Sequence, residues 1–201
     1  MTVFISVDMG KSAILIGPRC CGKTSVGKEA AEILDVPFVD ADEIFAEEYG
    51  TVNDYVKRNG GVPEGWREFR RRETEIINEI CALYDDTQIV LTPGGGAVAH
   101  DQGEECRKRN VELLSNFGKI FYLLPASDLE QSARILTERM LADQASAGQR
   151  PSLTGETDAY KEMLNVVTKR HPLYSAAAHI TIYTRDQTVK EIASDIAELV
   201  R

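Results

Sequence analysis

A chain of 201 residues with 43% apolar and 27% charged residues has the composition of a globular protein with one substantial core. Its net charge of −9 argues against general nucleic-acid binding, which needs a continuous basic face, and its apolar runs are far shorter than the roughly 20 residues of a membrane helix. The first residues lack the charged and long apolar regions of a secretion signal. We therefore expect a cytoplasmic protein that binds neither nucleic acid nor membrane.

Short apolar runs alternate with amphipathic segments along the chain, which is typical of a parallel sheet flanked by helices. Five runs rich in Ile, Val, Phe and Leu predict strands that are buried on both faces. They cover residues 13–16, 37–40, 88–92, 119–124 and 179–183. The predicted fold is a single α/β domain over residues 1–201 with a five-stranded parallel sheet.

Apolar residues three and four apart predict amphipathic helices between these strands. Ser127, followed by Glu130, predicts a capping box at the start of the helix that runs toward Arg134. The apolar faces of three further helices are Val26, Ala30, Ile33 and Leu34; Phe69, Ile76, Ile77, Ile80 and Leu83; and Val189, Ile192, Ile196 and Leu199.

Two polar stretches that contain glycine, 59–65 and 141–158, interrupt this alternation. Loops of such length inside a compact domain usually serve function, most often as lids. We expect a mobile lid over about residues 136–158.

Residues 17–24, GPRCCGKT, match the phosphate-loop pattern G-x-x-x-x-G-K-[ST] between a predicted strand and a predicted helix. Gly17 and Gly22 permit a close approach of backbone to ligand, and the N–H groups of the loop and of the helix N-terminus favour phosphate. In such loops the lysine, here Lys23, reaches the β- and γ-phosphates, and the hydroxyl of Thr24 ligates Mg²⁺. We expect ATP and Mg²⁺ to bind here, with nucleotide contacts from Gly17, Arg19, Cys20, Cys21, Gly22, Lys23, Thr24 and Ser25.

The four cysteines, Cys20, Cys21, Cys81 and Cys106, form no C-x-x-C pair and indicate reduced thiols in a cytosolic protein. We interpret Cys20 and Cys21 as small residues that line the loop, and Cys81 as a small apolar core residue.

Asp40 and Asp42 occupy alternate positions at the end of the second predicted strand and therefore point to the same side. The carboxyl ends of parallel strands border the ligand crevice, so Asp40 suits the Mg²⁺ shell and Asp42 an acceptor hydroxyl. A helix follows, and the pair is equally explained as a helix cap with an acidic first turn. The residues alone leave both interpretations open.

Arginines and glycines recur in the segments EFRRRE (68–73), PGGGA (93–97) and KRHPLY (169–174), and in Arg150-Pro151. Arginine suits the bidentate recognition of carboxylate or phosphate, and the glycines let a small polyol approach the backbone. Other residues of these regions have simpler interpretations. Arg71 and Arg72 are expected on a solvated helix face, His171 in a turn before Pro172, His100 and His179 in structural roles, and Trp66 in packing or substrate contact.

The segments GPRCCGKTSVG, FVDADEIF, EFRRRE, GGGA, RPSLTG and KRHPLY follow one another between about residues 13 and 184. Together they resemble the shikimate kinase family, and GPR-x-CGKT with RP-x-LTG is similar to the second common bacterial isozyme. The resemblance implies ATP-dependent phosphorylation of the shikimate 3-hydroxyl, in the pathway to aromatic amino acids. We expect a monomer.

The resemblance also implies roles for individual residues. Asp42 would bind the shikimate hydroxyls and act as the base, and Arg70 and Arg170 would clamp the substrate carboxylate. The ring hydroxyls would contact the glycine triplet, Gly94, Gly95 and Gly96. The substrate-binding region would span about residues 42–75. The catalytic set would be Lys23, Asp42 and Arg150, with Arg150 closing from the lid onto the phosphates and Arg134 lying against adenine.

Other functions remain compatible with these residues. A kinase for quinate, gluconate or a nucleoside monophosphate would use the same phosphate loop. A non-catalytic nucleotide-binding paralogue would be expected to lack the loop lysine or the acceptor groups, and none is missing. Two segments, 59–65 and the lid between Arg134 and Arg150, are longer than the family norm.

Overall fold

A computed structural model describes residues 12–142 and 157–201 of the chain. Its five strands form one sheet in the order β2-β3-β1-β4-β5, and every pairing is parallel. The predicted α/β class and the five-stranded parallel sheet are confirmed. The elements are β1 (Ser12–Ile16), α1 (Lys23–Leu34), β2 (Phe38–Asp40), α2 (Ala41–Tyr49), α3 (Val52–Arg58), α4 (Glu64–Leu83), β3 (Val90–Thr92), α5 (Glu104–Phe117), β4 (Gly118–Leu124), α6 (Leu129–Ala142), α7 (Ala159–Ala177), β5 (Ile180–Tyr183) and α8 (Val189–Val200).

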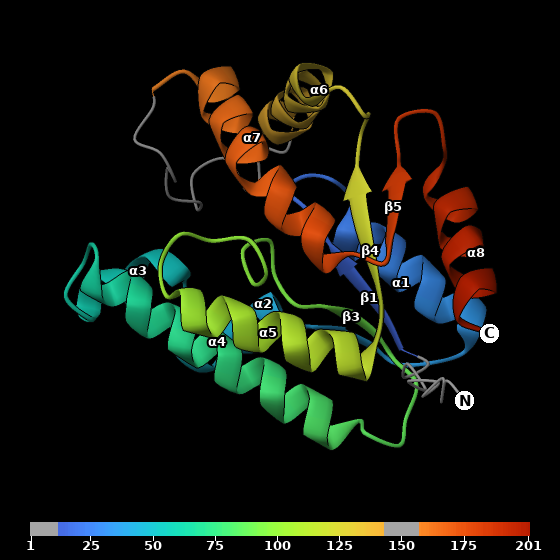
Figure 1. The fold of residues 1–201 in the computed structure, drawn as a ribbon, viewed down its shortest axis with the longest axis horizontal. Coiled ribbons are helices and arrows are strands. Elements are labelled where there is room, and N and C mark those ends of the chain that lie inside the picture. Colours follow the sequence, from blue (N-terminus) through green and yellow to red (C-terminus); the bar gives the residue numbers. More distant parts are fainter. Residues whose placement is uncertain (1–11, 143–156) are drawn as a thin grey trace, which may run out of the picture.

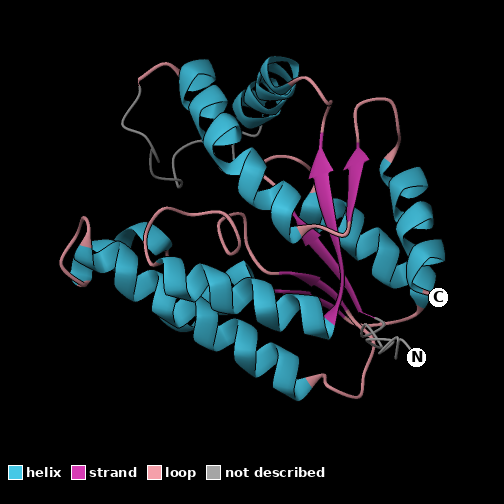
Figure 2. Cartoon of the chain, viewed as in Figure 1, coloured by secondary structure: helices cyan, strands magenta, loops and turns pink. Residues whose placement is uncertain are grey.

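Helices cover both sides of the sheet. α1 packs against α8 on one side, and α4 packs against α5 on the other (Figure 1). α6 and α7 pack against each other, and α6 lies beyond the carboxyl end of β4, at the top of the view (Figures 1 and 2). The strand ends that carry the phosphate-loop motif and Asp42 therefore meet below this helix pair. Within the described residues, no helix is both long enough and apolar enough to span a membrane.

The strands are buried because helices cover both faces of the sheet. All of β1 is buried, and its Ile14 lies opposite Leu91 of β3 and Ile120 of β4. The strand β5 is half-exposed and lies at the edge of the sheet. Each predicted strand is present, with bounds within two residues of the prediction.

The predicted apolar helix faces are correct in their centres and wrong at their ends. Leu83, Val189 and Leu199 are exposed. Each lies at or near a helix terminus, where the neighbouring element no longer covers the apolar stripe. In α8 the buried stripe continues instead through small residues, and its members are Ile192, Ala193, Ile196, Ala197 and Val200.

Two local predictions are wrong. The start of α6 is capped by Asp128 and not by Ser127, because the Asp128 carboxylate accepts the N–H of Gln131 at 2.6 Å. His171 and Pro172 lie inside α7 and not in a turn. Proline removes one helical N–H, but the buried Tyr174 and Ala177 beyond it keep the last turns of α7 packed on the core.

The first part of the predicted lid is helical, since α6 extends to Ala142. Residues 143–156 of the predicted lid, with Arg150, lie outside the described residues, and Asp158 at its end caps α7.

Candidate active site

The phosphate loop connects β1 to α1 through a tight turn. Gly17 has φ 145°, and a Cβ there would lie 2.5 Å from the carbonyl oxygen of Leu123 on β4. No residue with a side chain fits this position without moving the sheet. Gly22 is the N-cap of α1, so the loop leads directly into the N-terminus of a helix, where N–H groups favour phosphate.

Lys23 points back into the loop that precedes it. Its Nζ donates hydrogen bonds to the carbonyl oxygens of Gly17 at 2.9 Å and Pro18 at 2.8 Å. Burial lowers the pKa of the ammonium, but the nearby Cys21, Tyr174 and Asp42 groups raise it, and the net pKa lies above the ordinary value for lysine. Lys23 therefore carries its full positive charge at neutral pH.

Asp40 caps a helix and also lies beside Thr24, the other predicted Mg²⁺ ligand. As the N-cap of α2, it accepts the N–H of Asp42 on Oδ1 at 3.0 Å. Its other oxygen, Oδ2, accepts a hydrogen bond from the hydroxyl of Thr24 at 3.3 Å. The two predicted Mg²⁺ ligands thus lie side by side, and both are the hard oxygen donors that Mg²⁺ prefers. No cluster of three or more His, Cys, Asp or Glu side chains suited to a metal occurs in the described residues, and Mg²⁺ in kinases is usually held by one or two carboxylates together with phosphate oxygens.

Arg70 is buried on α4 beside the carboxylate of Glu73, for which the motifs predicted no role. Its Nη1 donates to both oxygens of Glu73 at 2.8 Å, and its guanidinium lies over the rings of Phe69 and Trp66 at 4.8 and 5.6 Å. Burial raises the pKa of Glu73, although Arg70 beside it opposes this shift. In the sequence, the only indication of this pair is that Arg70 and Glu73 are three residues apart in EFRRRE, which places them on one face of a helix.

The glycine triplet after β3 lies between the phosphate loop and α4. A Cβ on Gly96 would lie 2.6 Å from Nη2 of Arg70, and one on Gly95 would lie 3.7 Å from the Gly17 carbonyl oxygen and 4.0 Å from Nζ of Lys23. A Cβ on Gly94 would lie 2.8 Å from Oδ1 of Asp42. The triplet therefore borders the loop lysine, the candidate base and the buried arginine.

Arg170 reaches the same triplet from α7. Its Nη1 donates to the carbonyl oxygen of Gly95 at 3.3 Å, and the hydroxyl of Tyr174 donates to the same oxygen. No role was expected for Tyr174, although it ends the KRHPLY segment. Residues from α2, from α4, from the segment after β3 and from α7 thus converge beside the phosphate loop.

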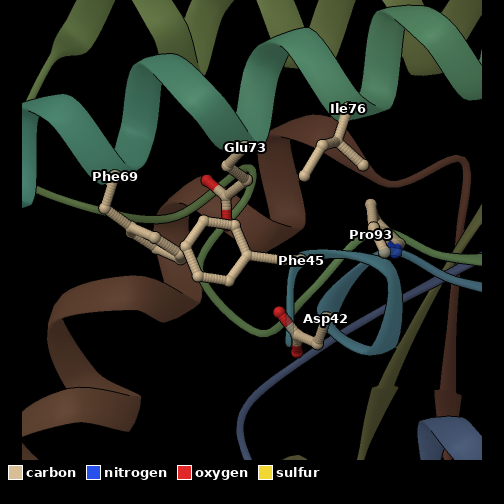
Figure 3. A pocket seen from close by; sticks show the side chains of 7 residues that line it. Asp42, Phe45, Phe69, Glu73, Ile76 and Pro93 are labelled. Atoms are coloured by element: carbon tan, nitrogen blue, oxygen red, sulfur yellow. The ribbon is translucent and has the colours of Figure 1, made fainter. Parts of the chain in front are cut away.

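A small cavity lies behind Asp42. Its volume of about 10 Å³ is room for roughly one water molecule. Figure 3 shows Phe69, Glu73 and Ile76 directed toward it from α4, and Asp42 and Phe45 from α2. The cavity is too small for a metabolite.

Arg19 and Arg134 contact α7 in the described structure. Arg19 forms an ion pair with Glu162 at 2.9 Å, which joins the phosphate loop to the first turn of α7. Arg134 is exposed on α6 and lies 5.8 Å above the ring of Tyr160. The assignment of Arg134 to adenine stays a prediction.

The predictions for the remaining side chains are mostly confirmed. Arg71 is exposed and pairs with Glu68, while Arg72 is only partly exposed and lies over the ring of Tyr49 at 5.2 Å. His179 accepts the N–H of Ile120 at 2.9 Å, which is a structural role.

Histidine and cysteine burial adds detail to these predictions. His100 is completely buried, and burial together with Arg70, Arg107 and Arg170 lowers its pKa to about 3. Cys21 is buried, whereas Cys20, Cys81 and Cys106 are partly exposed. Cys81 packs against the core, as expected.

Comparisons with known proteins agree with this geometry. A family model described as shikimate kinase matches residues 19–201. The chain belongs to the shikimate kinase family. The shikimate kinase of Syntrophus aciditrophicus is 36% identical over 194 residues, which cover 92% of this chain and 89% of that protein. Shikimate kinase 2 of Yersinia enterocolitica is 32% identical over 194 residues, which cover 96% and 97% of the two chains.

Solved structures extend the comparison to the fold. The shikimate kinase of Acinetobacter baumannii in complex with shikimate has a TM-score of 0.74 at 28% identity, covering 96% of this chain and 93% of that one. A gluconokinase of Sinorhizobium meliloti has a TM-score of 0.53 at 17% identity over 94% of this chain and 90% of that one, which shows a shared fold alone. The family resemblance in the sequence motifs is confirmed.

Proposed function

We propose that this shikimate kinase family member transfers the γ-phosphoryl group of ATP to the 3-hydroxyl of shikimate, yielding shikimate 3-phosphate and ADP. The observation that carries the proposal is the convergence of Asp42, Arg70 and Arg170 on a glycine triplet that borders Lys23. An anionic polyol needs cations for its carboxylate, a carboxylate for its hydroxyls and a phosphate site within reach. All of these groups are present beside one loop.

The substrate carboxylate is assigned to Arg70 and Arg170. Both are arginines whose planar guanidinium groups match a carboxylate in two parallel hydrogen bonds. Glu73 holds Arg70 in position through Nη1, with both terminal nitrogens of Arg70 facing Gly96 and Nη2 not bonded to Glu73. Asp42 is assigned to the hydroxyl groups at the opposite end of the acceptor.

Phosphoryl transfer requires positioning and charge neutralisation more than covalent chemistry by the protein. The acceptor oxygen forms a bond to the γ-phosphorus, the bond to the bridging oxygen breaks, ADP leaves, and Asp42 takes the hydroxyl proton. Lys23 keeps its charge because its pKa is raised, and it offsets negative charge on the phosphates. Mg²⁺ held by Thr24 and Asp40 would add to this neutralisation, and Arg150 is assigned the same task from the lid.

An ADP-release assay with shikimate, quinate, gluconate and nucleoside monophosphates in parallel tests the proposal. We expect turnover with shikimate at a kcat/KM at least tenfold above that with the other acceptors. If only one of the other acceptors is phosphorylated, that compound and not shikimate is the substrate. No turnover with any acceptor would favour a nucleotide-binding paralogue.

Two variants distinguish the proposed nucleotide site from the proposed acceptor site by their kinetic effects. Lys23→Ala should reduce kcat by about 10² or more, because it removes charge that acts in the transition state. Arg170→Ala should mainly raise the KM for shikimate, and an unchanged KM would contradict the assignment of the carboxylate.

A further inference from the structure

Tyr174 is a buried polar residue to which the proposed reaction assigns no role. It is only 1% exposed, and its ring is stacked on Tyr122 of β4 with a centroid distance of 5.0 Å. Its hydroxyl donates to the carbonyl oxygen of Gly95. Burial raises the pKa of Tyr174, so the phenol stays protonated and keeps this bond at neutral pH.

Tyr174 and Arg170 act on one carbonyl group. They are four residues apart on α7 and therefore share a helix face. Arg170 donates a long bond of 3.3 Å from Nη1 to Gly95 and also interacts with the Tyr174 hydroxyl. Since Tyr174 holds the same oxygen, Arg170 is not needed as its sole anchor and retains guanidinium N–H groups for a ligand.

The position of the Gly95 carbonyl determines the direction of the next N–H. The Gly95–Gly96 peptide is trans and planar, so the Gly95 C=O and the Gly96 N–H point in opposite directions. With the carbonyl turned toward α7, the N–H of Gly96 is turned away from α7. Gly96 itself lies against the guanidinium of Arg70.

We propose that Tyr174 is a positioning residue for the acceptor, whose hydroxyl holds the Gly95 carbonyl on α7, thereby orients the Gly96 N–H toward the acceptor hydroxyls and leaves N–H groups of Arg170 for the acceptor carboxylate. This inference rests on the proposed function, because the acceptor is taken to be a hydroxylated carboxylic acid. Tyr174 does not contact the reacting atoms. It acts through the glycine triplet and Arg170.

The test compares Tyr174→Phe with Tyr122→Phe in the ADP-release assay. Phenylalanine keeps the ring stack and removes only the hydroxyl. Tyr174→Phe should raise the acceptor KM by about fivefold to tenfold, the effect of one buried hydrogen bond, while the KM for ATP changes less than twofold. Tyr122→Phe is the control, because the Tyr122 hydroxyl lies 3.2 Å from Nδ1 of His171 and is not the group that holds the Gly95 carbonyl, so the acceptor KM should stay within twofold. An unchanged acceptor KM in Tyr174→Phe, or an equal rise in both KM values, would overturn the inference.

A double-mutant cycle with Arg170→Lys adds a second criterion. Since both side chains act on one carbonyl, the double variant should depart from the product of the two single effects. A product within experimental error would mean that Tyr174 acts independently of Arg170, which contradicts the mechanism.

Acceptor binding without turnover separates this inference from the proposed function. Trp66, the single tryptophan, lies 5.6 Å from the Arg70 guanidinium, so its fluorescence should report acceptor binding. A fluorescence titration with shikimate measures its affinity for wild type and for Tyr174→Phe. It is done at 10 °C so that a destabilised variant stays folded. An inactive wild type that binds shikimate more tightly than Tyr174→Phe contradicts only the proposed reaction. Equal affinities contradict only the role of Tyr174.

Discussion

Cys20 adopts a backbone conformation that side chains rarely take. Its φ is 63°, in the left-handed region, and it lies at the centre of the phosphate loop. For a residue with a Cβ, this conformation costs roughly 1–2 kcal/mol of stability relative to ordinary backbone angles. Such strain is common at ligand loops, where the surrounding structure imposes the conformation.

Cys20→Gly should therefore stabilise the protein slightly. Relief of strain exceeds the extra entropy of an unfolded glycine, and the free energy of unfolding should rise by about 0.5 kcal/mol. Urea unfolding measures the change. Cys21→Gly is the matched control, because Cys21 is buried and not in the left-handed region, so its loss should lower stability by about 1 kcal/mol or more. A destabilised Cys20→Gly would show that the thiol contacts outweigh the strain.

His100 should make the folded state sensitive to acid. Its pKa of about 3 in the folded protein lies below the value near 6.5 of an unfolded histidine, so the unfolded chain binds more protons between these limits. The stabilising contribution is present above about pH 6.5 and is lost as the pH falls toward 3. Arg70, Arg107 and Arg170, which face His100 from three helices, all oppose a positive charge there.

Urea unfolding of wild type and His100→Gln at pH 7 and pH 5 measures this effect. Between pH 7 and pH 5 the free energy of unfolding of wild type should fall by about 2 kcal/mol more than that of the variant. This figure follows because binding one proton in the unfolded state alone is worth about 1.4 kcal/mol per pH unit. Equal losses would mean that His100 does not account for the acid sensitivity.

At the scale of elements, the segment after β3 is held by helices on two sides. Gly95 is anchored to α7 through Arg170 and Tyr174, and Gly96 lies against Arg70 of α4. These helices are separated along the chain by β3, α5, β4 and α6. The short segment thus determines how the groups from α4 and α7 meet.

Gly96→Ala should disrupt this arrangement without preventing nucleotide binding. Its Cβ would lie 2.6 and 2.7 Å from the two terminal nitrogens of Arg70, so the guanidinium must move. We expect the acceptor KM to rise about tenfold or more, with the KM for ATP within about twofold, because one displaced charged hydrogen bond is worth about 1.5–3 kcal/mol. Gly50→Ala is the control: it strains a residue at φ 78° with open space around the Cβ, so it should lower stability alone. An unaltered acceptor KM in Gly96→Ala would mean that Arg70 does not bind the acceptor.

At the scale of the whole molecule, the site depends on strand order. β1 is the central strand, with β3 on one side and β4 on the other, and β2 lies beyond β3. This order places the carboxyl ends of β1, β2 and β3 side by side at one edge of the sheet. There α7 contacts the segment that follows β3. A ligand at this edge contacts segments far apart in the sequence.

Ligands should therefore stabilise the whole fold. A non-hydrolysable ATP analogue with Mg²⁺, at about 100 times its Kd, should add about 2.7 kcal/mol and raise Tm by roughly 5–10 °C. Shikimate should add a further rise. Thermal unfolding measures both, and Lys23→Ala should lose most of the nucleotide-dependent rise while retaining some response to shikimate. A full nucleotide response in Lys23→Ala would contradict the role of this lysine.

The sequence by itself determined the sheet, the phosphate loop and the family, because strand burial and loop chemistry are local properties of short segments. Asp42, Arg70 and Arg170 could be proposed as acceptor-binding residues because they belong to motifs. The pairing of Glu73 with Arg70 was foreseeable only as a helical spacing, and the hydrogen bond from Tyr174 to Gly95 was not foreseeable at all. Its partner is a backbone carbonyl 79 residues away, and no residue type encodes that contact.

Only the tertiary structure decided which local signals prevailed. Pro172 does not end α7, because packing beyond it outweighs the loss of one hydrogen bond. Asp40 proved to be both cap and candidate metal ligand, because its two oxygens face different partners, the N–H of Asp42 and the hydroxyl of Thr24. Local sequence specifies what a segment can form, whereas contacts between distant segments select among the possibilities through burial.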